Sequence, residues 1–343
     1  MLRAALLIFA LLRMLPAQQT AVPCDLLRSS SLQDQARQGL SNKSYAAAAH
    51  AFQDAFDACP TMHPLLLEAS RAAGAARDYP LAIRAARQFS GLEPNSVEGR
   101  IAVANAYFMA QQFPDALQWA EQALKSDASE PAALKLKGNI EYLMGRTADA
   151  LNTFVVLLDG HPQDADAAYM LGRIYYQEGR IDYAIGQFNR VLKIDPKSYK
   201  AYDNLGLCYQ ANGQMDLAIR YFLTAIKLVD KDHPEYDWPY ANLASLLIDQ
   251  GDAKKAYDAA AKAAERNPNS ARNFYLGAKA LCKLEKTDLC MNWLQRSVAL
   301  DPNYPEPLYL LARVYSQMGD EDKAKAALEK FRSLKANAPH QRK

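Results

Sequence analysis

The chain repeats itself every 34 residues, and this periodicity constrains its fold more than any other feature of the sequence. Nine units align, and four additional residues near the segment DKDHPEYDW shift the frame once, between the sixth and the seventh unit. The units begin at Ser29, His63, Val97, Pro131, Ala165, Tyr199, Asp237, Ala271 and Pro305. A period of this length predicts stacked structural units, each of which contacts mainly its neighbours.

Two columns of the alignment hold only small residues, and they predict where helices approach closely. Position eight is Ala, Ser or Gly in every unit, and position twenty is Ala except in the eighth unit, where it is Cys. The residues at position eight are Ala36, Ser70, Ala104, Gly138, Gly172, Gly206, Ala244, Ala278 and Ala312. Those at position twenty are Ala48, Ala82, Ala116, Ala150, Ala184, Ala218, Ala256, Cys290 and Ala324.

Other columns divide each unit into two halves. Apolar residues recur with helical spacing in both halves, for example Tyr175 and Tyr209 at position eleven and Phe188 at position twenty-four, and these are predicted to be core residues. Glycine recurs at position fifteen, between the halves, where a tight turn favours it. Proline recurs at position thirty-two, where it ends the second half. Each unit is therefore predicted to be a helix-turn-helix hairpin.

A 34-residue helical hairpin with Leu-Gly, Tyr, Ala, Phe and Pro in this order resembles the tetratricopeptide repeat. The best matches are LGRIYYQEGRIDYAIGQFNRVLKIDP, residues 171–196, and LGLCYQANGQMDLAIRYFLTAIKLVD, residues 205–230. The resemblance covers residues 29–336 and implies an all-α, right-handed superhelical solenoid of about nine stacked repeats. The eighth unit departs most, with Glu285 in place of the turn glycine and Cys290 in place of the alanine.

The N-terminal residues show the succession of regions that is typical of a secretory signal peptide. In MLRAALLIFALLRMLPAQQ, Arg3 precedes an apolar run from Ala4 to Leu12, and the small Ala17 follows. This run is too short to span a bilayer as a helix. We therefore predict a signal peptide at residues 1–17, no membrane span after its cleavage, a lead at 18–28 and a basic tail at 337–343. Lipid attachment at Cys24 is a second interpretation, although Pro23 stands where a lipobox has a small residue.

Export would place the cysteines in an oxidising compartment, where disulfides can form. Cys282 and Cys290 lie at positions twelve and twenty of one unit, just either side of its turn, and are candidates for a disulfide. Cys24 and Cys59 lie at the two ends of the first hairpin, which an antiparallel fold returns to the same side. Cys208 is left as a small buried hydrophobe. The alternative is that all five cysteines are buried thiols.

Composition and motifs exclude several classes of function. Lys and Arg number 40 against 38 Asp and Glu, so the chain lacks the basic excess typical of nucleic-acid binding. The five histidines are scattered, at residues 50, 63, 161, 233 and 340, and form no metal-ligand spacing. There is no GxSxG elbow, P-loop or dinucleotide fingerprint. We therefore predict a non-catalytic chain with no cofactor, no metal site and no nucleic-acid partner.

The resemblance implies a scaffold or adaptor that binds a protein or peptide segment in a concave groove lined by the first helices. In tetratricopeptide repeat proteins, the side chains that line this wall come from positions two, five, six, nine, twelve and thirteen of the repeat. The predicted groove residues in units four to seven are Lys135, Asn139, Tyr142, Tyr169, Arg173, Tyr176, Lys200, Asn204 and Asn242. Such side chains can hold a carboxylate or the backbone of an extended peptide.

Two details of this wall refine the resemblance. Lys135, Asn139 and Lys200 match the carboxylate clamp of some family members, but Met170 and Asn204 replace the expected Asn and Arg. Asn204 and Asn242 share position six and resemble two rungs of the asparagine ladder of other members. These polar residues could also form only a solvated face.

Two alternative functions stay open at this point. The chain could be a structural or assembly subunit of a cell-envelope machine, binding a folded partner through its outer surface or its ends. It could also be the non-catalytic, substrate-presenting subunit of an enzyme complex. An exported chain of this type suggests the periplasm or the extracellular space of a bacterial envelope. The four-residue insertion is expected to lengthen a loop between two repeats, and we interpret it as a tolerated insertion.

Overall fold

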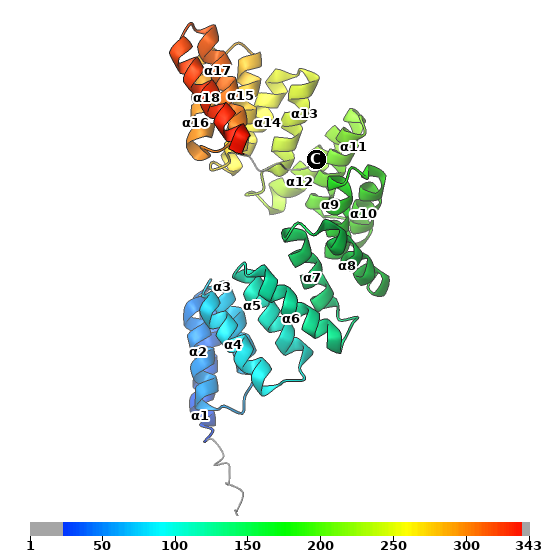
Figure 1. The fold of residues 1–343 in the computed structure, drawn as a ribbon, viewed down its shortest axis with the longest axis vertical. Coiled ribbons are helices and arrows are strands. Elements are labelled where there is room, and N and C mark those ends of the chain that lie inside the picture. Colours follow the sequence, from blue (N-terminus) through cyan, green and yellow to red (C-terminus); the bar gives the residue numbers. More distant parts are fainter. Residues whose placement is uncertain (1–22, 338–343) are drawn as a thin grey trace, which may run out of the picture. The chain divides into compact units, whose positions relative to one another are not determined.

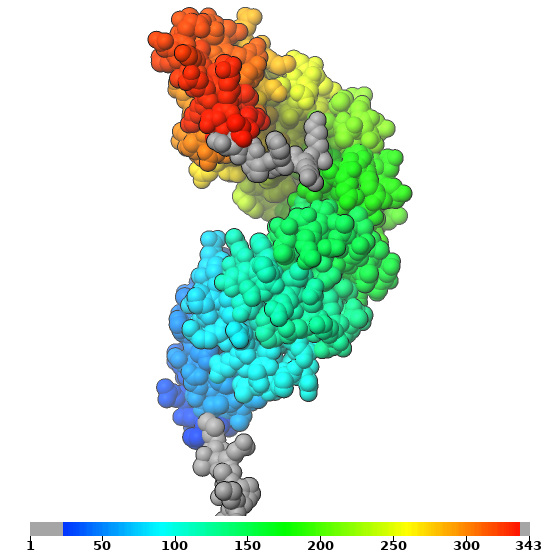
Figure 2. All heavy atoms as spheres, viewed as in Figure 1, coloured from blue at the N-terminus to red at the C-terminus, as the bar shows by residue number. Residues whose placement is uncertain are grey.

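The computed structural model describes residues 23–337, which form a succession of α-helices (Figure 1). The chain divides into two compact units, with the boundary between Arg146 and Thr147. Within each unit, side chains fill the space between neighbouring helices (Figure 2). The predicted signal peptide and parts of the predicted lead and basic tail lie outside the described residues.

Each repeat contributes two helices, and the fourth repeat gives its first helix to the first unit and its second helix to the second. The helices of the first unit are α1 (Leu26–Ser41), α2 (Tyr45–Ala58), α3 (Pro64–Ala75), α4 (Tyr79–Leu92), α5 (Val97–Met109), α6 (Phe113–Ser126) and α7 (Pro131–Leu143). Those of the second unit are α8 (Thr147–Gly160), α9 (Ala165–Gln177), α10 (Ile181–Ile194), α11 (Tyr199–Ala211), α12 (Met215–Asp232), α13 (Trp238–Gln250), α14 (Ala253–Arg266), α15 (Ala271–Lys283), α16 (Thr287–Leu300), α17 (Pro305–Gln317) and α18 (Glu321–Asn337).

The predicted helical-repeat solenoid is confirmed, and the first helix shows one difference in detail. Helix α1 begins at Leu26, before the expected start at Ser29. The side chain of Asp25 accepts a hydrogen bond from the backbone N–H of Arg28 at 3.0 Å and so caps this helix. The alignment of columns found the repeat frame but not the cap, which lies outside the frame.

The turns between the paired helices confirm the role predicted for position fifteen. The glycines at this position have positive φ angles between 72° and 86°. Four repeats lack the glycine and hold Lys43, Arg77, Gln111 and Glu285 in the same left-handed conformation, with φ between 58° and 62°. The turn geometry is therefore kept even where a side chain makes it costly.

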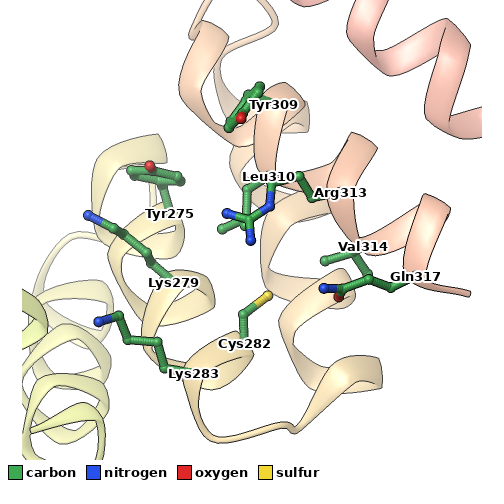
Figure 3. Close-up of a pocket in the computed structure, with 9 residues that line it drawn as sticks. All are labelled: Tyr275, Lys279, Cys282, Lys283, Tyr309, Leu310, Arg313, Val314 and Gln317. Carbon is green, nitrogen blue, oxygen red and sulfur yellow. The ribbon is translucent and has the colours of Figure 1, made fainter. Parts of the chain in front are cut away.

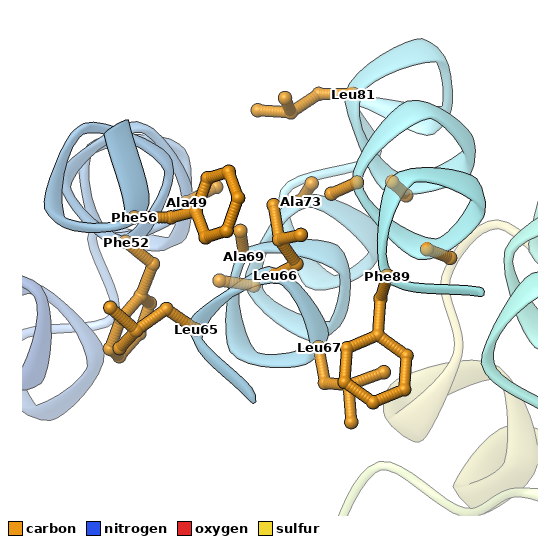
Figure 4. Packing of buried hydrophobic residues seen from close by; sticks show 14 of the residues in the cluster. Ala49, Phe52, Phe56, Leu65, Leu66, Leu67, Ala69, Ala73, Leu81 and Phe89 are labelled. Carbon is orange, nitrogen blue, oxygen red and sulfur yellow. The ribbon is translucent and has the colours of Figure 1, made fainter. Parts of the chain in front are cut away.

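The two small-residue columns mark the contacts that close each hairpin. A Cβ atom added to Gly206 would lie 2.5 Å from the ring of Phe222, and one added to Gly172 would lie 2.8 Å from the ring of Phe188. The residues at position twenty are all buried, with exposed fractions from 0% to 7%. In the first unit, further alanines, among them Ala49 and Ala69, belong to one buried cluster with Phe52, Leu66 and Phe89 (Figure 4).

The eighth repeat packs differently from the others. Its glycine at position seven, Gly277, lies against the ring of Trp293, which occupies the space that a Cβ atom would need. Trp293 also contacts the rings of Tyr257 and Phe274, with centroid distances of 5.5 and 5.2 Å. A large ring over a glycine therefore closes this hairpin one position away from the usual column.

The insertion mainly lengthens a helix, so the expectation of a longer loop was wrong. Helix α12 has 18 residues, whereas α10 and α14 have 14. In most repeats a proline stops the second helix, but here Pro234 comes only after the additional residues. Helix α12 therefore continues to Asp232, and residues 233–237 form the connection to α13.

Both predicted cysteine pairs lie at disulfide distance. The Cα atoms are 4.1 Å apart for Cys24 and Cys59 and 5.3 Å apart for Cys282 and Cys290. Cys208 is unpaired and buried, as predicted. Among the helices of residues 23–337, none combines the length and the apolar character that crossing a bilayer requires.

Gly206→Ala should destabilise the protein by about 1–3 kcal/mol, because the new methyl group overlaps the buried ring of Phe222. Gly186→Ala in α10 is the matched control, since among the described residues no side chain and no backbone outside its own stretch of helix lies within 4 Å of the added Cβ. This control should instead stabilise the protein by about 0.5–1 kcal/mol through helix propensity. Urea denaturation of both variants measures the difference, and equal effects would contradict this packing.

Candidate functional site

In the second unit, the first helices of successive repeats contact one another in the order α9, α11, α13, α15 and α17. We call the surface that they share the first-helix wall. Tyr169, Arg173 and Tyr176 lie on α9, Lys200 and Asn204 on α11, and Asn242 on α13. The other predicted groove residues, Lys135, Asn139 and Tyr142, lie on α7 of the first unit, and the site described below consists of second-unit residues alone.

One pair of predicted residues joins α9 to α11. The side-chain amide of Asn204 donates a hydrogen bond to the hydroxyl of Tyr169 at 3.1 Å and another to the carbonyl of Lys200 at 2.8 Å. Tyr169 is at position five of its repeat, and Asn204 is at position six of the next one. The two residues therefore link neighbouring first helices through their polar ends.

The same geometry recurs one repeat later and is buried there. The amide nitrogen of Asn242 donates to a carboxylate oxygen of Asp203 at 2.9 Å, again from position six to position five of the preceding repeat. Arg272 on α15 donates to the amide oxygen of Asn242 at 2.8 Å. Asp203 and Asn242 are each only 3% exposed. The amide of Asn242 thus connects α11, α13 and α15 inside the wall.

The residues contributed by the insertion border this network. Tyr236 packs edge-on against Tyr199, with ring centroids 4.7 Å apart, and His233 also lies against Tyr199. Arg266 of α14 donates to the carbonyl of Pro234 at 2.9 Å and pairs with Asp230, so the connection is held in place. Burial raises the pKa of Tyr236, and the nearby carboxyl of Asp203 raises it further. The insertion therefore builds part of the wall, which its interpretation as a tolerated loop did not anticipate.

Asp203 is the most perturbed carboxyl group of this network. Burial raises its pKa to about 7, against the opposing effects of the Asn242 hydrogen bond and the Arg272 charge. The carboxylate of Asp237 adds a further upward contribution to this pKa. Asp237 is itself buried and accepts a hydrogen bond from Asn273 at 2.5 Å. The network therefore places two acids and one arginine in a site with little access to water.

A pocket of about 390 Å³ opens further along the wall, between α15 and α17 (Figure 3). The side chains that line it combine positive charge, aromatic rings and aliphatic groups, and none of them is acidic. They are Tyr275, Lys279, Cys282 and Lys283 from α15, and Tyr309, Leu310, Arg313, Val314 and Gln317 from α17. Cys282 connects this wall to α16 through its pairing with Cys290. Within residues 23–337, no group of three His, Cys, Asp or Glu residues is placed to hold a metal ion.

Comparison with known families fits the repeat architecture. Models described as tetratricopeptide repeat match residues 67–131 and 135–199, residues 198–269 and residues 293–326. The chain belongs to the tetratricopeptide repeat family. Members of this family are generally non-catalytic scaffolds that bind proteins or peptides. None of the curated protein sequences compared with this tetratricopeptide chain matches it.

Solved structures share the fold at low sequence identity. A tetratricopeptide repeat protein from Parabacteroides merdae matches with a TM-score of 0.53 and 17% identity, covering 84% of this chain and 99% of its own. The Cut9–Hcn1 hetero-tetramer of APC/C matches with a TM-score of 0.62 and 17% identity, covering 84% of this chain and 57% of its own. Pseudomonas aeruginosa pilF matches with a TM-score of 0.54 and 18% identity, covering 65% of this chain and 99% of its own. These similarities concern the helical-repeat fold alone.

Sequence reasoning missed the three cationic residues that line this pocket. Lys279 and Arg313 occupy position nine and Lys283 position thirteen, all of them wall positions in tetratricopeptide repeats. Their repeat positions alone would have identified them, but the predicted groove ended at the seventh repeat. Asp203, at position five, was readable in the same way. Two residues near it could not be placed from the spacing: Arg272 comes from the eighth repeat, and Tyr236 lies in the connection that leads to α13.

Asp203→Asn should change how stability depends on pH. Because the pKa of Asp203 is raised to about 7 in the folded chain, the folded state binds a proton more tightly than the unfolded state does. Its contribution to stability is therefore complete below about pH 4 and is lost as the pH rises through 7. Urea denaturation between these pH values should show a smaller loss of stability in the variant.

The matched control for this experiment is Asp216→Asn, which removes an exposed carboxylate at the start of α12. The pH profile of this control measures the effect of removing one exposed carboxylate. A pH profile of Asp203→Asn that coincides with the profile of the control would contradict the raised pKa.

Proposed function

We propose that this tetratricopeptide chain is a non-catalytic scaffold or adaptor that binds an extended polypeptide segment on the first-helix wall of its second unit. The observation that supports this proposal best is the pocket between α15 and α17, because first helices alone build it. Its volume of about 390 Å³ suits a few side chains of a bound segment rather than a folded domain.

The tyrosines of the wall favour a polypeptide ligand. Tyr309 is 47% exposed, and Tyr176 is half-buried on α9. A tyrosine ring offers a flat apolar area and a polar tip, and it loses little conformational entropy when a ligand covers it. An extended segment that crosses several first helices would contact one such ring after another.

An assembly subunit of a cell-envelope machine is the second candidate function, with binding through the second helices. Exposed apolar side chains favour it, namely Val156 on α8, Tyr183 on α10, Leu223 on α12 and Leu289 on α16. Each lies on a different helix, however, and single exposed apolar residues are common on protein surfaces. The first-helix wall is therefore the better-supported binding surface.

An exported location, in the periplasm or outside a bacterial cell, belongs to the same proposal. The two cysteine pairs at disulfide distance support it, because disulfides persist in oxidising compartments. Alkylation of the denatured protein from its native cells should modify only Cys208 before reduction and all five cysteines after it. Five reactive thiols without reduction would contradict this location.

Photo-crosslinking distinguishes the two surfaces. Benzoylphenylalanine at Tyr176 or Tyr309 places a reactive group on the first-helix wall, whereas at Tyr183 or Leu289 it lies on the second helices. In cells that produce the protein, we expect the two wall positions to trap the same polypeptide and the second-helix positions to trap none. Mass spectrometry of the crosslinked products identifies the residues that are joined.

Trapping from Tyr183 and Leu289 alone would overturn the wall proposal in favour of an assembly subunit. Catalytic turnover of a small molecule by the isolated chain would overturn the scaffold proposal altogether. Unchanged melting temperatures of the four substituted proteins would show that each still has the native fold.

A further inference from the structure

We propose that the pocket between α15 and α17 recognises carboxylate groups of an acidic polypeptide segment. This inference rests on the proposed function and adds the chemistry of the ligand. Three observations carry it: the charge along the first helices, the absence within residues 23–337 of an acidic partner for Lys279, Lys283 and Arg313, and the arrangement of these three cations across the wall.

Positive charge is concentrated on two neighbouring first helices. Helix α15 contains Arg272, Lys279 and Lys283 and no acidic residue, and α17 contains Arg313 and Glu306. The whole chain, in contrast, has a formal net charge of only +2. Arg272 is engaged with Asn242 inside the wall, and Glu306 pairs with Lys335 of α18 at 2.9 Å. The charge presented by the pocket is therefore positive.

The three cations of the pocket have no carboxylate within ion-pair distance among residues 23–337. Lys255 and Lys323 on nearby second helices, in contrast, pair with Asp252 at 2.8 Å and with Asp320 at 2.7 Å. Lys283 instead donates to the carbonyl of Ile248, at 3.1 Å, at the end of α13. A ligand carboxylate would therefore form charge-assisted hydrogen bonds here without first breaking an internal ion pair.

The cations are spread across the wall rather than gathered around one point. In Figure 3 the guanidinium group of Arg313 reaches from α17 toward α15, and the ammonium groups of Lys279 and Lys283 extend to the opposite side of α15. Lys283 there meets the end of α13. A row of cations across two neighbouring first helices fits several carboxylates along an extended chain better than one compact anion, which needs convergent donors.

The remaining lining residues suit the uncharged parts of such a segment. Leu310 and Val314 present aliphatic surface, and Tyr275 and Tyr309 present rings at the same end of the pocket (Figure 3). Glutamate and aspartate side chains carry their charge on a short hydrocarbon stem, so they can use both kinds of surface. A nucleic-acid ligand is less well matched, because its affinity depends on many phosphate contacts and a broad basic surface.

Fluorescence anisotropy with defined peptides tests the inference on the full mature chain with its cysteine pairs intact. The probe is a fluorescein-labelled hexaglutamate with an amidated C-terminus. Lys279→Gln combined with Arg313→Gln should weaken its binding by at least about tenfold, because both charges contact the ligand. The matched control combines Lys254→Gln on α14 with Lys330→Gln on α18, which removes the same charge from exposed second-helix positions and should leave binding nearly unchanged.

Three further probes show which negatively charged group of a ligand the pocket binds. Hexaglutamine amide should not bind, because it keeps the length of the peptide and lacks its charge. Hexaglutamine with a free C-terminus that binds through the same two residues would assign the pocket to a terminal carboxylate, which retains the proposed chemistry. Hexathymidylate that binds as tightly as hexaglutamate would overturn the choice of a polypeptide.

Equal binding of hexaglutamate to the pocket variant and the unmodified chain would overturn the inference, as would no binding to either. Failure of the inference can be told apart from failure of the proposed function. If the partner still crosslinks from Tyr176 in the pocket variant, the wall binds a polypeptide but the pocket does not select its acidic groups.

Discussion

Each hairpin is held together by the close approach of its two helices at a residue with little or no side chain. In the fifth and sixth repeats the ring of Phe188 or Phe222 lies where a Cβ atom of Gly172 or Gly206 would be. This contact holds the second helix of each hairpin against the first, and packing at interior density makes it intolerant of additional atoms. Because the ring covers one side of the first helix, another side of that helix remains available to form the wall.

The wall is stabilised by polar contacts that are unusual for an interior. The Asp203–Asn242–Arg272 chain ties three first helices together, and each of its polar groups has a partner, so the cost of burying it is partly offset. Removing the side chain of Asn242 would break both hydrogen bonds and leave the buried Asp203 without this donor. The same wall therefore contains a buried, hydrogen-bonded segment at α11 to α15 and a charged, open segment at α15 to α17.

The sequence allowed much of the fold to be predicted because the determinants of a helical hairpin are local. Three kinds of residue determine the structure of the repeat that contains them: glycine at the turn, proline after the second helix and alanine at position twenty. The wall depends on contacts between repeats. Asn204 was predicted as a wall residue from its position in the repeat, but its hydrogen bond to Tyr169 joins residues 35 positions apart in the sequence. The inserted residues could be counted, but spacing alone did not show that Tyr236 would pack against Tyr199.

We propose that a polypeptide binds on the first helices of the second unit and not on its second helices. Hydrogen–deuterium exchange of the full chain, with and without the hexaglutamate peptide, distinguishes these two surfaces because it locates the bound region helix by helix. We expect slower exchange in α15 and α17 when the peptide is bound, with α14 and α16 unchanged. Slower exchange confined to α14, α16 or α18 would contradict the claim.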